Sequence, residues 1–277
     1  MKKSLIALAL VGAFAVPAFA EETPAAAEAS PHTVTGNLTL ATSYRFRGID
    51  QTFGKPALQG GIDYSHASGF YVGNWNSNVS SGAGFPDGNL EMDFYGGWRG
   101  TFDDFGVDVG AIYYYYPGSE ADVFHTRASG GAVNNKEVYV GASWKFLSLK
   151  YSYAFDDYFS MRGTANDDGK STKGSSYLEF NMNYDLGDGW GINGHVGHFY
   201  AKNIKNGDYT DWKVGVTKDL SGWVVGLAYV DTNADGNCNK AFQPYCFVSS
   251  WDSDGQTSSS NKDAGRGIAV LSVTKSF

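Results

Sequence analysis

The residues of this 277-residue chain that are best placed to do chemistry are charged side chains that recur at every second position. Arg45 and Arg47 stand two apart, and so do Glu91 and Asp93. Side chains two apart on a β-strand lie on the same face of a sheet. Each pair therefore presents like charges to one side of its strand. Six residues are candidates for lining a polar interior: Arg45, Arg47, Asp63, Glu91, Asp93 and Arg99.

These charges allow two interpretations. Arg45 and Arg47, facing Asp63 and the acids of neighbouring strands, would set up a transverse field that orients a polar solute in a narrow pore. The same residues could instead form salt bridges that only close and stiffen the interior. Further charged residues share the polar face of the predicted strands: Asp108, Glu137, Lys145, Lys150, Asp156, Glu179, Asp211 and Lys213.

Other chemistry has little support. No G-x-S-x-G segment is present, which weakens a hydrolase interpretation without excluding it. His195 and His198 are three apart, so on one strand they face opposite sides and cannot share a metal. The segment 231–237 resembles the start of a calcium loop, but Phe242 stands where that loop needs a glutamate. We expect no enzyme activity, no cofactor and no resident metal.

The elements that must position the charged residues begin after an export signal. Lys2 and Lys3 precede an apolar stretch at 5–16, and Ala-Phe-Ala at 18–20 is a small-x-small cleavage site. This is the layout of a secretory signal peptide, and the apolar stretch is too short for a membrane helix. The expected organisation is a signal peptide at 1–20, a flexible lead-in at 21–35 and one β-domain at 36–277.

Composition narrows the class of protein. The chain has 21 Lys and Arg against 29 Asp and Glu, a net charge of −8, which argues against nucleic acid as a partner. Aromatic residues make up 16% and glycine occurs 36 times, both high for a soluble domain. No run after the signal is long and apolar enough for a spanning helix. A membrane location would therefore require a barrel.

Alternation of apolar and polar residues recurs about twelve times and predicts strands. Leu38, Leu40, Tyr44 and Phe46 fall on the apolar face of the first one, and Tyr44 and Phe46 are expected in an aromatic girdle. The expected strands are 36–47, 56–66, 69–80, 89–102, 105–116, 136–146, 148–158, 175–186, 189–201, 210–220, 222–232 and 265–277.

The connections alternate in length. Short turns are expected at 67–69, 103–104, 147, 186–189 and 220–222. Long loops are expected at 48–55, 81–88, 117–135, 159–174, 202–209 and 233–264. This sorting is typical of outer-membrane barrels, whose long loops lie outside the cell. Cys238 and Cys246 lie in the last loop, and in an oxidising compartment their spacing favours a disulfide. The roles of the loops 117–135 and 233–264 stay open.

The last strand helps to orient the apolar face. Ala269, Leu271, Val273, Lys275 and Phe277 alternate, and the chain ends on the aromatic Phe277. This resembles the signal that outer-membrane proteins present to the barrel-assembly machinery, although Lys275 departs from it. We therefore expect an all-β fold, a transmembrane antiparallel up-and-down β-barrel of about 12 strands in an outer membrane. Its partners would be the lipid bilayer and the assembly machinery.

Several segments resemble the TorF-type family of outer-membrane porins. The segment S-Y-R-F-R-G at 43–48 is the most specific, and Asp50 departs from the small hydroxyl residue expected there. Further matching segments are P-A-L-Q-G-G-I-D-Y at 56–64, 69–75, E-M-D-F-Y-G-G at 91–97 and Y-Y-P-G at 115–118. The resemblance implies an outer-membrane location and a porin-like fold, without a known substrate.

The leading functional hypothesis is a channel for passive passage of small polar solutes. About twelve strands make a narrower barrel than porins of about 16 to 18 strands, which favours a small-solute channel over a general sieve. A structural or surface-interaction barrel with a closed lumen and functional loops is the alternative. A membrane-embedded hydrolase is a weaker one.

Overall fold

The computed structural model describes residues 30–121, 131–163, 169–252, 255–256 and 260–277. The expected signal peptide and most of the expected lead-in lie outside these residues, as do parts of the loops 117–135, 159–174 and 233–264. Among the described residues, no helix has the length and apolar character that crossing a membrane requires.

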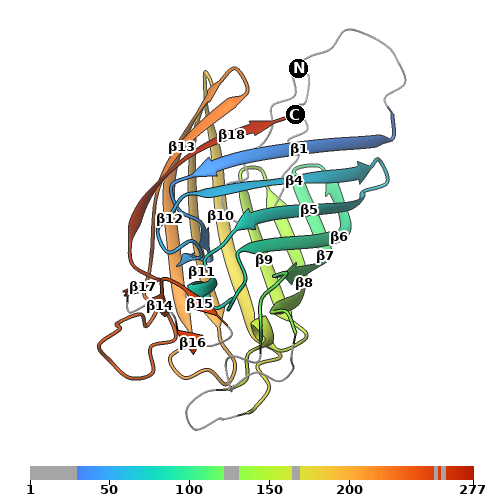
Figure 1. Ribbon diagram of the computed structural model, residues 1–277. Coiled ribbons are helices and arrows are strands. Elements are labelled where there is room, and N and C mark those ends of the chain that lie inside the picture. Colours follow the sequence, from blue (N-terminus) through green and yellow to red (C-terminus); the bar gives the residue numbers. More distant parts are fainter. Residues whose placement is uncertain (1–29, 122–130, 164–168, 253–254, 257–259) are drawn as a thin grey trace.

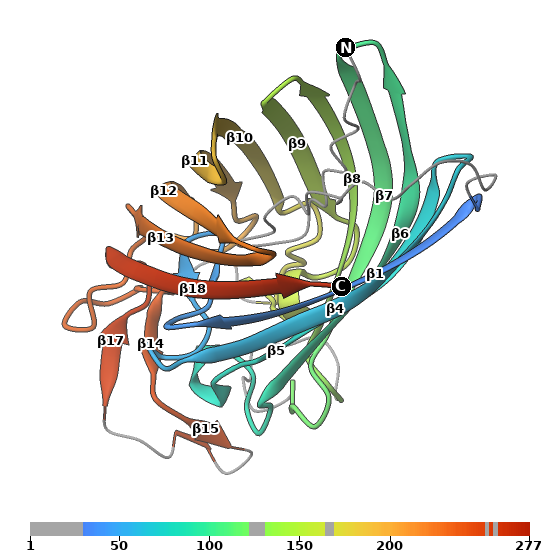
Figure 2. The same ribbon diagram turned by 90° about the horizontal axis from the view of Figure 1, so that it is seen from above.

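Twelve antiparallel strands form one closed barrel, which confirms the predicted fold class (Figures 1 and 2). Each strand pairs with its neighbours in chain order, and β1 closes the ring against both β4 and β18. The barrel strands are β1 (His32–Ala41), β4 (Ala57–His66), β5 (Phe70–Asn78), β6 (Leu90–Phe102), β7 (Phe105–Tyr115), β8 (Asn134–Trp144), β9 (Leu147–Ala154), β10 (Ser176–Gly187), β11 (Trp190–Tyr200), β12 (Tyr209–Leu220), β13 (Trp223–Thr232) and β18 (Ile268–Ser276).

The apolar face of the strands points outward. Leu58, Ile62 and Val214 are 58%, 62% and 65% exposed, whereas the neighbouring inward residues Gln59 and Asp211 are buried. Exposing a continuous belt of large apolar side chains to water is unfavourable, whereas the same belt matches the hydrocarbon of a bilayer. The outer wall is therefore built to contact lipid.

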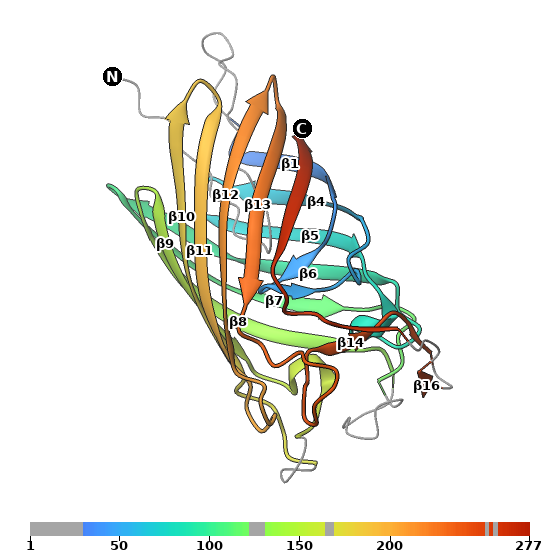
Figure 3. The same ribbon diagram turned by 90° about the vertical axis from the view of Figure 1, so that its left-hand side faces the viewer.

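Long loops and short turns lie at opposite ends of the barrel. In Figure 3, the strands β14 (Cys246–Val248) and β16 (Gly255–Gln256) of the last loop lie at the end opposite the turns between β10 and β11 and between β12 and β13. The remaining short elements also belong to long loops: β2 (Arg45–Phe46), β3 (Ile49–Asp50), η1 (Ser81–Ala83), η2 (Tyr158–Ser160), β15 (Trp251–Asp252) and β17 (Asn261–Asp263).

The first strand differs from its prediction. It begins at His32, four residues before the expected position 36, and ends at Ala41 instead of at position 47. The chain leaves the wall there and turns into the barrel, so Tyr44 is buried inside and Phe46 packs against buried interior residues. Neither residue belongs to an outer girdle. The turn expected at 147 is also displaced, because Leu147 already pairs with Trp144 and the turn is at 145–146.

The outward-facing wall predicts the effect of one charge. Val214→Arg places a cation on the outer face near the middle of β12, and we expect it to lower the free energy of unfolding in lipid by about 2–4 kcal/mol. Substitutions on a surface that faces water usually change the free energy of unfolding by no more than about 0.5 kcal/mol. Denaturant titration in lipid vesicles measures the change, with Phe242→Arg in an exposed loop as the control. Equal stability of the two variants would contradict a lipid-facing wall.

Candidate functional site

The candidate site is the barrel interior together with a hairpin inserted into it. After β1 the chain forms the short strands β2 and β3, which pair across the two-residue turn Arg47–Gly48. Both turn residues have positive φ, 49° and 81°, as a type I′ hairpin turn requires. A Cβ atom on Gly48 would lie 2.4 Å from Thr232 Cγ2 and 2.6 Å from Asp211 Cβ. Only glycine therefore lets the tip of the hairpin approach β12 and β13 this closely.

Aromatic contacts hold the hairpin to strands β5 and β7 of the wall. The ring of Tyr44 lies 5.5 Å from that of Trp75 on β5, and the ring of Phe46 lies 5.5 Å from that of Tyr114 on β7. Phe46 also contacts Phe159 of η2 at 5.9 Å. These rings belong to one buried apolar cluster that includes residues of β5, β6, β7, β10, β11 and β12. The half of the barrel interior nearest the long loops is therefore packed.

Arg47 makes the most specific contact of the hairpin. Its Nη1 and Nη2 donate to the two carboxylate oxygens of Glu137 on β8 at 2.9 and 2.7 Å. Nη1 also donates to Tyr158 Oη at 3.3 Å, and the guanidinium carbon lies 4.4 Å from the ring centre of Tyr177 on β10. The side chains of Arg47 and Glu137 are 7% and 2% exposed. Burial acts to lower the pKa of Arg47, but Glu137 reverses this and the pKa lies well above its usual value.

Arg45 ties the hairpin to the last loop instead of to the wall. Its Nη1 donates to the carbonyl oxygen of Ala264 at 2.8 Å, and its Nη2 lies 3.7 Å from Asp50 Oδ2. The backbone N–H of Asp50 donates to the same carbonyl of Ala264 at 3.0 Å. The hairpin and the last loop therefore share a network of backbone and side-chain contacts.

The prediction that Arg45 and Arg47 point inward from the first strand opposite Asp63 was wrong. Both arginines lie on the hairpin, and their acidic partners are Asp50 and Glu137. The reason is that the strand ends at Ala41, so these residues are not part of the wall.

Glu91 and Asp93 lie on the inner face of β6, buried at 1% and 2% exposure. Tyr44 Oη of the hairpin donates to Glu91 Oε1 at 3.2 Å. Among the described residues, Glu91 Oε2 and Asp93 Oδ1 have no hydrogen-bond partner. The wall beside the hairpin thus carries three buried carboxyl groups, Glu91, Asp93 and Glu137. The buried Asn135 on β8 donates through Nδ2 to Glu137 Oε1 at 3.0 Å.

The half of the interior nearest the short turns is less tightly packed. Asp63 on β4 accepts a hydrogen bond from Tyr95 Oη at 2.6 Å, and Arg99 on β6 stacks 4.1 Å from the ring centre of Tyr71. Asp63 and Arg99 are only partly buried, and Thr101, two residues beyond Arg99 towards the turn, is exposed. The interior residues are therefore more accessible towards the turns than towards the long loops.

On the inner faces of β9 and β10, Lys150 Nζ lies 3.1 Å from Glu179 Oε1. His195 Nε2 lies 2.8 Å from Asp211 Oδ2, and its Nδ1 lies 2.6 Å from Asn181 Oδ1. His198 contacts Thr210 on the outer face, so the two histidines do face opposite sides. No group of three or more His, Cys, Asp or Glu in the described part of the chain is arranged to hold a metal ion.

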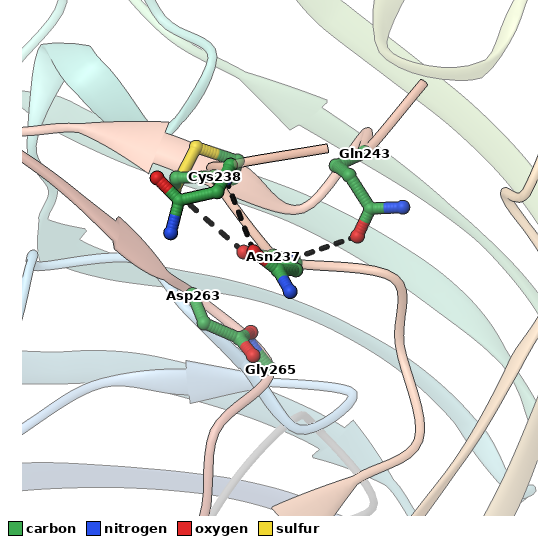
Figure 4. Close-up of a disulfide and its surroundings, with 8 residues drawn as sticks. Asn237, Cys238, Gln243, Asp263 and Gly265 are labelled. Carbon is green, nitrogen blue, oxygen red and sulfur yellow. Dashed lines mark hydrogen bonds between the residues drawn. A yellow bond between two sulfur atoms is a disulfide. The ribbon is translucent and has the colours of Figure 1, made fainter. Parts of the chain in front are cut away.

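The last loop carries a disulfide between Cys238 and Cys246 (Figure 4). Beside it, Asn237 N–H donates to Gln243 Oε1 at 2.8 Å, and Gly265 N–H donates to Asp263 Oδ1 at 2.8 Å. Ala264, which holds Arg45, lies between Asp263 and Gly265 and donates to the carbonyl of Tyr245 at 2.9 Å. The disulfide loop thus braces the segment that anchors the hairpin.

The sequence did not reveal the partners of Arg47. Glu137 falls on the predicted polar face of its strand, so alternation placed it inside without showing which cation it binds. Tyr158 lies in a loop, where alternation says nothing about orientation. The contact between Arg47 and Glu137 joins residues 90 apart in the chain.

Fold and interior together define a closed β-barrel with an apolar outer wall and a polar inner face, the layout of outer-membrane barrels. A family model for bacterial proteins of unknown function, Gcw_chp, matches residues 25–251. The chain belongs to this Gcw_chp family. The resemblance to the TorF-type family stays an expectation beside it.

Several solved structures are similar to this chain at low sequence identity. The NanC porin is 10% identical with a TM-score of 0.50, and the match covers 88% of this chain and 99% of that one. The KdgM porin is 11% identical with a TM-score of 0.48, covering 88% and 98% of the two chains. The toluene transporter TodX of P. putida is 10% identical with a TM-score of 0.42, covering 90% and 93%. A search of curated proteins gives no match.

The buried ion pair of the hairpin predicts a large and specific loss of stability. Arg47→Ala leaves Glu137 buried without its cation, and we expect a loss of about 3–5 kcal/mol in the free energy of unfolding. Lys136→Ala breaks an exposed pair with Asp156 of the same 2.7 Å length, and surface pairs contribute about 0–1 kcal/mol.

Denaturant unfolding in lipid vesicles compares these variants with Arg47→Ala/Glu137→Gln. The double variant has no bare buried charge, so we expect it to regain much of the stability that Arg47→Ala loses. Similar losses for Arg47→Ala and Lys136→Ala would contradict the role given to the buried pair.

Proposed function

We propose that this protein is an outer-membrane channel for passive passage of small polar solutes, and that the hairpin of β2 and β3 gates it. The signal peptide 1–20 would direct export, the barrel-assembly machinery would recognise the strand ending at Phe277, and the long loops would face outside. The proposed activity involves no catalysed reaction.

One observation carries the proposal: the hairpin closes the interior without being part of the wall. β1 pairs directly with β4 from His32↔His66 to Ala41↔Ala57, so the barrel is continuous without the hairpin. The hairpin is held by side-chain contacts and by hydrogen bonds to the last loop. When the hairpin moves, water can form the hydrogen bonds that its polar groups lose. Moving a strand of the wall would instead break the backbone hydrogen bonds of the closed sheet.

The polar inner face supports passage of polar solutes. Porin interiors are polar and hold water, while their outer faces contact lipid. Here Asp63 and Arg99 lie in the half nearest the turns, and Lys150 and Glu179 place a cation and an anion on the neighbouring strands β9 and β10. Side chains of this kind can exchange hydrogen bonds with a passing solute.

The closed-lumen alternative rests on the same hairpin. If the contacts of Arg47 and the aromatic packing never release, the barrel would be a structural or surface-interaction protein. The two functions differ in one measurable property, the ion current through the barrel.

A single methyl group at the hairpin tip should raise that current. Gly48→Ala would place a Cβ within 2.4 Å of Thr232 Cγ2 at a φ of +81°, which disfavours the docked hairpin. We expect wild-type protein in planar bilayers to open rarely, and Gly48→Ala to open at least several times more often.

Gly222→Ala is the matched control for this experiment. Gly222 has the same φ of +81° in a turn at the opposite end, but its nearest neighbour is the flexible Lys275 Nζ. Both variants should still shift in gel mobility on boiling in SDS, as folded barrels do. Silent bilayers for wild type and Gly48→Ala alike would support the closed-lumen alternative and refute the channel.

A further inference from the structure

We infer that the residues that hold Arg47, namely Glu137 and Tyr177 of the wall and Tyr158 of the loop element η2, form a binding site for a small organic cation with a guanidinium or primary ammonium group. Arg47 occupies this site as a tethered competitor. The role of that cation as the transported solute rests on the proposed function, whereas its binding does not.

The contacts of Arg47 are those of a recognised ligand. The guanidinium forms a two-point contact with the Glu137 carboxylate at 2.9 and 2.7 Å, which matches the fork geometry of guanidinium–carboxylate recognition. Tyr158 Oη accepts a further hydrogen bond at 3.3 Å, and the ring of Tyr177 covers one face at 4.4 Å. Anionic, polar and aromatic groups thus surround a single cation.

The site belongs to the wall and to a loop, not to the hairpin. Glu137 lies on β8, Tyr177 on β10 and Tyr158 on η2, and all three side chains are buried. Tyr177 is itself held in place, because its Oη donates to Asp211 Oδ1 at 2.7 Å. The partners of the guanidinium are therefore positioned by elements that stay behind when the hairpin moves.

The backbone of Arg47 points to a role for its side chain. It is the first central residue of a type I′ turn, with φ at 49°, a position that favours Asn, Asp or Gly. A positive φ is unfavourable for the backbone of an arginine, so the turn itself gives no reason for an arginine at this position. The contacts of its guanidinium offset the unfavourable backbone, as expected where strain accompanies a functional contact.

The carboxylate of Glu137 selects a cation. When the hairpin leaves, it removes Arg47 from the interior, while the buried Glu137 remains with its hydrogen bond from Asn135 Nδ2 at 3.0 Å. A buried carboxylate that loses its partner is strongly unfavourable until another cation replaces it. Lys150 on the neighbouring strand β9 already pairs with Glu179 at 3.1 Å. An entering cation that binds Glu137 therefore favours the undocked hairpin over the docked one.

Chemical rescue tests this site without any measurement of current. Full-length Arg47→Ala in lipid vesicles is heated with increasing methylguanidinium chloride, and the unfolding midpoint is followed by gel mobility. We expect a saturable rise of several degrees for Arg47→Ala and a smaller rise for wild type, in which Arg47 competes. Choline chloride at equal ionic strength lacks N–H donors and should give no saturable rise. If Arg47→Ala does not fold, Arg47→Gln replaces it.

Arg47→Ala/Glu137→Gln is the matched control, because it keeps the vacated space and removes the carboxylate. Its midpoint should not respond to methylguanidinium beyond the choline baseline. The inference is overturned if Arg47→Ala shows no saturable rise, or if the double variant shows the same one. A saturable rise together with silent bilayers would uphold the site and refute the channel, whereas current without rescue would refute the site alone.

Discussion

Closure of the sheet between β1 and β18 is the constraint on which the rest of the structure depends. The seam runs from Asn37↔Ser276 to Ala41↔Ser272, and it pairs the last free edge of the sheet. In lipid an open edge would leave backbone groups without partners, which only a closed barrel avoids. Closure also gives every strand one outer and one inner face. Apolar residues such as Val214 then face lipid, and Glu91 and Asp93 face an enclosed interior.

The buried carboxylate of Glu137 on the inner wall makes an inserted cation favourable. The seam needs only the residues up to Ala41, so the chain that follows is free to enter the barrel. There Phe46 and Tyr44 bury their rings while Arg47 neutralises Glu137. The disulfide loop holds the same hairpin through Arg45 and Ala264. The barrel thus has a continuous wall and, inside it, a hairpin held by non-covalent contacts, an arrangement that suits the gated channel proposed above.

Alternation along the chain predicted the wall well and the closure poorly. Twelve strands with one apolar and one polar face each follow from the period of two, because a half-buried strand imposes that period. The signal peptide, the sorted loops and the terminal Phe277 predicted that the apolar face points to lipid. The same pattern continues through Tyr44 and Phe46, since β2 is also extended, so it could not show that β1 ends at Ala41. The chain leaves the wall after Ala41 because Tyr44 packs on Trp75 and Arg47 binds Glu137 inside the barrel. Both contacts join distant parts of the chain. The strand-borne candidates Asp63, Glu91, Asp93 and Arg99 do lie inside the barrel, but their partners depended on the closed ring.

The central claim is that the hairpin separates the two ends of the interior, and thiol accessibility tests it most directly. Asn193→Cys places a thiol on the inner face of β11 in the half nearest the turns, and the native cysteines are joined to each other. A membrane-impermeant thiol reagent is added in sodium chloride to one side of an oriented bilayer. The account predicts rapid labelling from the side of the short turns and little from the side of the long loops. Equal labelling from both sides would show that the interior is open past the hairpin, and would contradict the account.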